Sequence, residues 1–156
     1  MKLVKPVISV GFVFCLISIS MLTNASTPLI EATKNQNRTE VEKLLDSGVN
    51  ADDSQGDGAT AMHWAAYRND AGIADSLLKH GANPNSSDDH GVTPLSLAVL
   101  NANLDLVKLL LSGGANPNLR QKNGQTALMV ASRVGKKSIV EALLNEGANV
   151  NDAEKT

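Results

Sequence analysis

Residues 90–118 read HGVTPLSLAVLNANLDLVKLLLSGGANPN, and this stretch decides the fold of the chain. Its Thr-Pro pair favours a helix start, because the threonine hydroxyl can cap a helix and proline needs no amide partner in the first turn. A second, leucine-rich helix is predicted at about residues 104–112, and Gly114 permits the left-handed backbone that ends it. Helical spacing predicts buried side chains at Leu95, Ala98, Val99, Leu106, Val107, Leu110 and Leu111.

The same pattern recurs along the chain at a fixed interval. Gly58, Gly91 and Gly124 are evenly spaced, and each is followed two positions later by a threonine. Leucine pairs recur at the same interval and are followed by Gly-Ala-Asn or Gly-Val-Asn. A fixed period of about 33 residues is typical of stacked helix-turn-helix units, each too small to bury its own apolar face.

With these motifs the chain resembles the ankyrin-repeat family. The motifs are GATAMHWAA, GVTPLSLAV and GQTALMVAS, each followed by a leucine pair and then GANPN or GANVN. The resemblance implies an all-α solenoid of about four helix-turn-helix repeats with short β-hairpin or turn connections. The expected domain covers residues 26–152, followed by a tail at residues 153–156. Its repeats are expected at about residues 26–52, 53–85, 86–118 and 119–152.

The N-terminal segment, residues 1–25, differs from the rest. Lys2 and Lys5 precede an apolar run at residues 7–22, and small residues follow it. This pattern is typical of a secretory signal peptide, with cleavage after Ala25. The alternative is an uncleaved membrane anchor, since tilt or local thinning of the bilayer accommodates a run somewhat shorter than about 20 residues. We therefore expect a periplasmic or secreted protein, or one anchored in the inner membrane and facing the periplasm.

Composition and charge favour a protein partner over nucleic acid. The chain has 14 Lys and Arg against 16 Asp and Glu, and loss of the two lysines in the signal peptide makes the net charge more negative. Seven acidic residues lie between residues 51 and 90, and five basic residues with no acid lie between residues 120 and 140. This uneven distribution of charge either belongs to ordinary solvated faces or serves to orient a partner.

The histidines do not form a catalytic pattern. His63 stands where the resemblance implies a histidine that bonds within the turn structure, and His80 is expected at a helix end. His90 lies beside Asp88 and Asp89 at a predicted hairpin tip, but no further spaced ligand supports a metal site. A nucleophile–base pair and a phosphate loop are not evident. We therefore expect no enzymatic activity, cofactor, metal or small-molecule substrate.

Two repeats contain local departures from the pattern. Gly72 falls in the second helix of repeat two, where glycine costs roughly 1 kcal/mol relative to alanine. The last repeat has no evident cap, so Ile139, Leu143 and Val150 are expected to be only partly covered. Trp64 occupies an apolar position of the motif and is expected in the core between repeats, with a role as a contact residue as the alternative.

The resemblance implies that a partner protein binds the concave side, formed by the hairpin tips and the exposed side of the first helices. Tyrosine and arginine are favoured at binding hot spots, so Tyr67 and Arg68 beside Leu100 and Arg133 are the main candidates. The residues expected to contact the partner are Asp57, Tyr67, Arg68, Asp89, His90, Leu100, Asn101, Lys122 and Arg133.

The sequence therefore predicts an exported, monomeric protein–protein interaction module. The resemblance to small bacterial members of the family implies that it protects or assists a periplasmic enzyme under stress. Two alternatives remain open: a secreted effector that binds a host protein, and a membrane-anchored tether if the N-terminal segment is not cleaved. A hydrolase on a repeat scaffold is disfavoured, since no nucleophile–base pair is evident.

Overall fold

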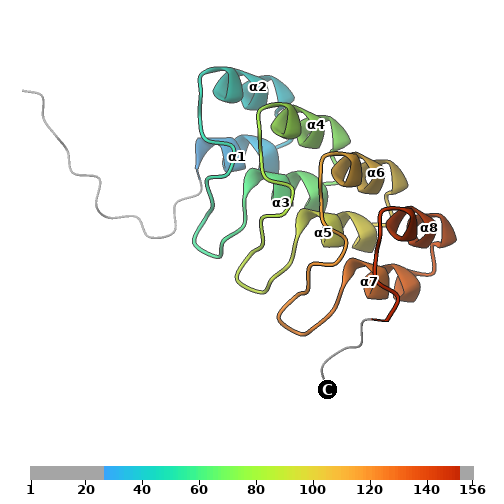
Figure 1. The fold of residues 1–156 in the computed structure, drawn as a ribbon. Coiled ribbons are helices and arrows are strands. Elements are labelled where there is room, and N and C mark those ends of the chain that lie inside the picture. The colour runs from blue at the N-terminus through green and yellow to red at the C-terminus, as the bar shows by residue number, and fades with distance from the viewer. Residues whose placement is uncertain (1–26, 152–156) are drawn as a thin grey trace, which may run out of the picture.

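The structure, a computed structural model, describes residues 27–151. They form two layers, with α1, α3, α5 and α7 in an inner row and α2, α4, α6 and α8 in an outer row (Figure 1). Three loops, which we call the fingers, follow α2, α4 and α6 and project beyond the inner row (Figure 1). The helices are α1 (Pro28–Lys34), α2 (Arg38–Asp46), α3 (Ala61–Tyr67), α4 (Ala71–Lys79), α5 (Pro94–Leu100), α6 (Leu104–Ser112), α7 (Ala127–Val134) and α8 (Lys137–Asn145).

The all-α repeat fold expected from the sequence is confirmed. Within the described residues the fingers are turns rather than paired strands, with one isolated antiparallel bridge between Ser54 and Thr60. In the same part of the chain, no helix is both long and apolar enough to cross a membrane. The predicted signal peptide at residues 1–25 and the tail at residues 153–156 lie outside the described residues.

The inner helices begin in the same way in every repeat, directly after a threonine. The Thr93 hydroxyl accepts a hydrogen bond from the Ser96 amide at 3.2 Å, and the Ser96 hydroxyl oxygen accepts one from the Thr93 amide at 3.0 Å. This reciprocal arrangement satisfies two backbone donors at the helix end. The predicted cap at Thr93 is therefore confirmed.

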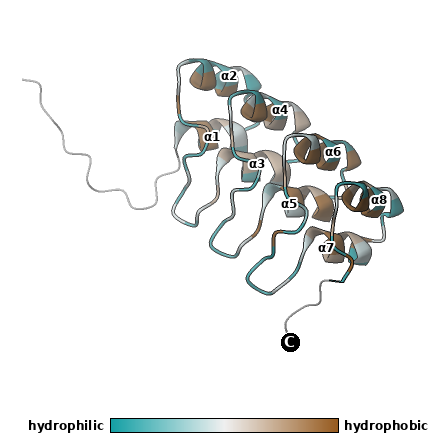
Figure 2. Ribbon diagram, viewed as in Figure 1, coloured by the Kyte–Doolittle hydropathy of each residue, from teal (hydrophilic) through white to brown (hydrophobic). Residues whose placement is uncertain are grey.

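The core runs along the stack between the two layers. All seven side chains predicted to be buried in repeat three are at most 7% exposed. Ala65, Ala98 and Ala131 are completely buried in α3, α5 and α7, where their small size lets neighbouring helices approach closely. Figure 2 shows that the hydrophobic residues lie mainly in the helices, whereas the fingers are mostly hydrophilic. The core therefore belongs to the stack and not to any single helix pair.

An asparagine ladder joins the repeats beyond the outer helices. The Asn85 amide group donates to the Gly114 carbonyl at 2.9 Å, and its oxygen accepts from the Asn116 amide at 2.7 Å. Asn118 makes the equivalent pair of bonds to the next repeat. Asp52, one repeat earlier, accepts the Asn83 amide but has no amide group to donate. The first step of the ladder is therefore made by a carboxylate.

An ion pair ties repeat one to repeat two. Arg38, the first residue of α2, donates to both carboxylate oxygens of Asp70, at 2.7 and 3.3 Å. Asp70 is buried, and its Oδ1 also accepts the Ile73 amide at the start of α4. Burial raises the pKa of Asp70, but the hydrogen bonds from Arg38 and the Ile73 amide together hold the pKa below its ordinary value.

Gly72 makes room for this ion pair, a role not predicted from the sequence. It lies in the first turn of α4, and a Cβ atom there would be only 2.7 Å from the guanidinium carbon of Arg38. The helix has nine residues, as do the other outer helices, so the glycine does not shorten it. Gly72, which was expected to weaken the helix of repeat two, therefore lies where repeat two closely contacts repeat one.

The last repeat is better covered than expected. Ile139 and Leu143 are at most 1% exposed, because α8 packs on both α6 and α7. The prediction of partial coverage was wrong for these two residues. Val150 is 66% exposed, as expected, and Leu144 is also exposed.

Replacing Asp70 with asparagine keeps an acceptor for the Ile73 amide and removes the charge that faces Arg38. At neutral pH we expect unfolding to require about 1 kcal/mol less, since the lost contact is charge-assisted but Arg38 is largely exposed. The pKa is lowered in the folded state, so this stabilisation is present above the unfolded value of 3.8 and lost as pH falls through the folded value. Urea unfolding of both proteins across this range measures the difference; a difference independent of pH would contradict the ion-pair account.

Candidate functional site

Two adjoining hollows lie between the fingers and the inner helices. The first encloses about 220 Å³ beside α3 and α5, and the second about 160 Å³ beside α5 and α7. Val92 and Leu97 line both, so the hollows form one continuous surface feature, which we call the groove. The larger apolar side chains that line it are Trp64, Tyr67, Val92, Leu97, Leu100 and Val130.

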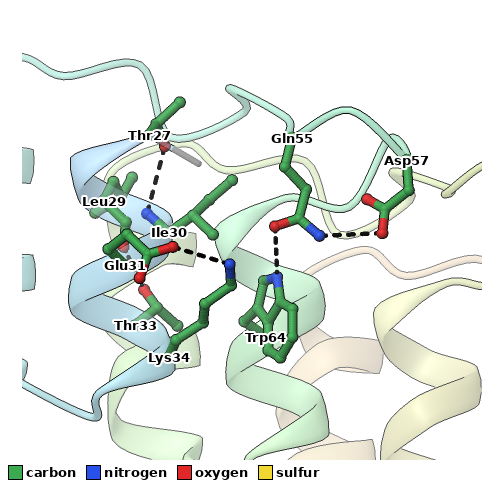
Figure 3. A network of polar contacts seen from close by, with 9 residues as sticks. All are labelled: Thr27, Leu29, Ile30, Glu31, Thr33, Lys34, Gln55, Asp57 and Trp64. Atoms are coloured by element: carbon green, nitrogen blue, oxygen red, sulfur yellow. Dashed lines mark hydrogen bonds and ion pairs between the residues drawn. The ribbon is translucent and has the colours of Figure 1, made fainter. Parts of the chain in front are cut away.

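Trp64 is held from several sides at one end of the groove (Figure 3). The Lys34 ammonium group lies 4.7 Å from the centre of its ring, and the indole N–H donates to Gln55 Oε1 at 3.3 Å. Lys34 is itself paired with Glu31 at 3.0 Å. The Tyr67 ring meets the indole edge-on, with centroids 5.7 Å apart. These contacts fix the orientation of the indole before any ligand arrives.

His63 ties α3 to the next finger. Its Nδ1 accepts the Thr60 amide at 3.1 Å, and its Nε2 lies 3.0 Å from the Val92 carbonyl, to which the N–H donates. Burial lowers the pKa of His63, so the neutral ring that this arrangement needs is favoured. Its predicted role within the turn structure is confirmed, and the contact also positions Val92 in the groove.

The fingers stack through their backbones. The Asp89 amide donates to the Asp57 carbonyl at 2.8 Å, and the Lys122 amide donates to the His90 carbonyl at 2.9 Å. At Gly91 a Cβ atom would come within 3.0 Å of the next finger's backbone, so this approach requires glycine. Asp89, His90 and Lys122, all predicted contact residues, are thus exposed on closely stacked fingers and do not line the groove.

The structure brings three of the predicted contact residues together in the groove. Tyr67 lines the first hollow, and Leu100 and Arg133 line the second. Tyr67 and Leu100 are the last residues of α3 and α5, and they are 58% and 57% exposed. Arg68 follows Tyr67 and is exposed without lining either hollow.

Two other predicted contact residues have internal hydrogen bonds. The side-chain amide of Asn101 donates to the carbonyls of Ala66 and Tyr67, at 3.0 and 3.2 Å, so it joins the end of α3 to α5. The Asp57 carboxylate accepts the Ala59 amide and the Gln55 side chain, each at 3.0 Å. The Ala59 amide is the main cause of a lowered pKa at Asp57, which favours the ionised form.

Trp64 and Leu97 line the groove but were not among the predicted contact residues. Trp64 was expected in the core; it is half-buried and packs against the core, but one side lines the first hollow. The signal lay in the repeat register, because Glu31, Trp64, Leu97 and Val130 occupy the same position in successive repeats. Placing them in one row predicts that Leu97 lies beside Trp64.

The remaining histidines have structural positions. His80 ends α4 as predicted, and contacts with the Ser76 carbonyl and the Asp46 carboxylate raise its pKa. The Asp88 side chain beside His90 accepts the amides of His90 and Val92, both at 2.8 Å. Among residues 27–151, no group of three or more His, Cys, Asp or Glu side chains is placed to hold a metal ion.

The Lys34 contact can be tested with the fluorescence of Trp64, the only tryptophan in the sequence. We expect Lys34→Ala to increase acrylamide quenching and to lower the free energy of unfolding by about 0.5–1 kcal/mol, the usual value of an exposed cation–π contact. Lys43→Ala is the matched control, since Lys43 also pairs with a glutamate one helical turn away but lies in α2, whereas the cation over the indole comes from α1. Equal quenching in both variants would contradict the proposed fixing of Trp64.

Comparison with known families gives two overlapping matches to a model described as "Ankyrin repeats (3 copies)", at residues 7–88 and 73–154. A search of curated proteins finds no match to the chain. Ankyrin repeats typically bind other proteins and are generally binding modules rather than enzymes. The matches cover most of the sequence and agree with the two-layered stack of helix pairs, and the chain therefore belongs to the ankyrin-repeat family.

Proposed function

We propose that this protein is an exported, monomeric interaction module that binds a partner protein in the groove. In this proposal it protects or assists a periplasmic enzyme and has no catalytic activity of its own. The observation that carries the proposal is the pair of exposed apolar side chains in the groove: Tyr67, which meets the fixed indole of Trp64, and Leu100 in the second hollow.

The groove side chains favour binding because they are both exposed and rigidly held. Large apolar side chains left in water favour association, and tyrosine and tryptophan are enriched at the centres of binding sites. A side chain already held in place loses little conformational entropy when it binds. Trp64 is held by Lys34, Gln55 and Tyr67, so the groove offers a preorganised apolar centre.

Export is supported by the charged and apolar pattern of residues 1–25. Cys15, the only cysteine of the sequence, lies within that segment. The remaining chain therefore forms no disulfide bonds, which suits an oxidising compartment because cysteines cannot mispair there.

A crosslinked pull-down from a periplasmic extract tests the proposal, with protein starting at Ser26 as bait. The Tyr67→Ala/Leu100→Ala variant removes two exposed apolar side chains of the groove. Leu144→Ala/Val150→Ala is the matched control, because these residues are similarly exposed but lie outside the groove. We expect the groove variant to bind the captured partner at least about tenfold more weakly and the control to bind unchanged.

Thermal unfolding of all three proteins establishes that the variants remain folded. Loss of the partner with the control variant alone would place binding at the last repeat and contradict the proposal. Equal capture by all three proteins would also contradict it, since the groove would then contribute nothing to binding.

A further inference from the structure

The groove is charged differently at its two ends. Asp88 lines the first hollow, and Asp57 lies beyond Gln55 on the preceding finger (Figure 3). Arg133 lines the second hollow at the other end. Within residues 27–151, none of these three side chains forms an ion pair. Their charges are therefore not neutralised within the described chain and can attract opposite charges on a ligand.

The register of the repeats explains why only one end offers a cation. Lys34, Tyr67, Leu100 and Arg133 occupy equivalent positions in successive repeats, at the ends of the inner helices. Lys34 is engaged with Glu31 and with the Trp64 ring. Arg133 donates to the neutral side chain of Gln125, at a long 3.5 Å, and forms no ion pair with another described residue. The row thus places two exposed apolar side chains next to one unneutralised cation.

The dimensions of the groove favour an extended ligand. Hollows of about 220 and 160 Å³ each accept a single large side chain. A helix with its side chains is about 10–12 Å wide and would not enter either of them. An extended segment instead presents one side chain to each hollow in turn and leaves its charged neighbours free to reach the two ends.

We propose that the groove receives an extended segment of the partner protein with a defined order of side chains. A large apolar side chain enters the first hollow against Trp64, Tyr67 and Leu97. A basic residue next to it faces Asp57 and Asp88, and an acidic residue farther along faces Arg133. This inference rests on the proposed function and adds to it the chemistry and the orientation of the ligand.

The repeat spacing sets the distance between these features. Packed helices lie about 8–10 Å apart, and an extended chain advances about 3.3 Å per residue, so one repeat corresponds to about three residues. The first hollow lies between α3 and α5, and Arg133 is on α7. The acidic residue therefore lies about four or five residues from the apolar one. A phosphate backbone does not fit this surface, since the carboxylates of Asp57 and Asp88 would repel it.

A displayed library of random 16-residue peptides, panned on protein expressed from its full sequence, tests the inference. We expect selected peptides to share an apolar residue beside a basic one, with an acidic residue at the stated distance. On Arg133→Glu the acidic preference should become basic, and a peptide selected on the unaltered protein should bind about threefold to tenfold more weakly. Lys108→Glu is the matched control, because it makes a similar charge reversal on the outer helix α6.

At the other end, Asp57→Asn/Asp88→Asn retains the oxygens that accept the finger amides and removes the two charges. The preference for a basic residue should then disappear. The inference would be overturned if peptides selected on Arg133→Glu still preferred an acidic residue. It would also be overturned if Tyr67→Ala/Leu100→Ala selected the same peptides as the unaltered protein.

A library with no enriched sequence would overturn it as well. If the pull-down partner still depended on Tyr67 and Leu100 in that case, the groove would bind a folded surface, and the proposed function would stand without the extended segment. If the library instead gave enriched, charge-ordered peptides while capture of the pull-down partner did not depend on Tyr67 and Leu100, the groove would bind an extended segment and the proposed function would be contradicted.

Discussion

The constraint on which the structure depends is that one pair of short helices cannot bury its own apolar side. The inner helices have seven or eight residues and the outer helices nine, which is too short for independent stability in water. Each repeat must therefore cover its neighbour. Buried alanines such as Ala98 allow the close approach that this requires, and Asn85, Asn118 and the Arg38–Asp70 pair connect successive repeats at their edges.

The groove is a consequence of the same stacking. Side chains at equivalent positions form rows along the stack. A different residue at one of these positions therefore changes one site on a continuous surface. His63 and the finger contacts hold Val92 and the acidic residues on one side of this surface. The ends of α3 and α5 hold Tyr67 and Leu100 on the other. Local capping and turn geometry thus set the positions of the apolar and charged side chains that a ligand meets.

The fixed spacing of the repeats predicted the stacked helix pairs, the Thr-Pro pair predicted the cap at Thr93, and helical spacing predicted the buried side chains of repeat three. These patterns did not predict the side-chain contacts between neighbouring repeats. The role of Gly72 depends on Arg38 in the preceding repeat, and Trp64 is neither core nor surface because Lys34 and Gln55 cover parts of it. Tyr67, Leu100 and Arg133 were predicted as contact residues and do line the groove. That Leu97 lines the same groove depends on how neighbouring repeats pack, which the motif of a single repeat does not show.

Site-specific photocrosslinking can establish whether the partner binds in the groove. A photoreactive amino acid would be placed at Leu100 in the groove and, in a second protein, at Lys108 on the outer helix. We expect the partner to be crosslinked from position 100 and not from position 108. Crosslinking from position 108 alone would contradict binding in the groove and move the binding surface to the outer helices.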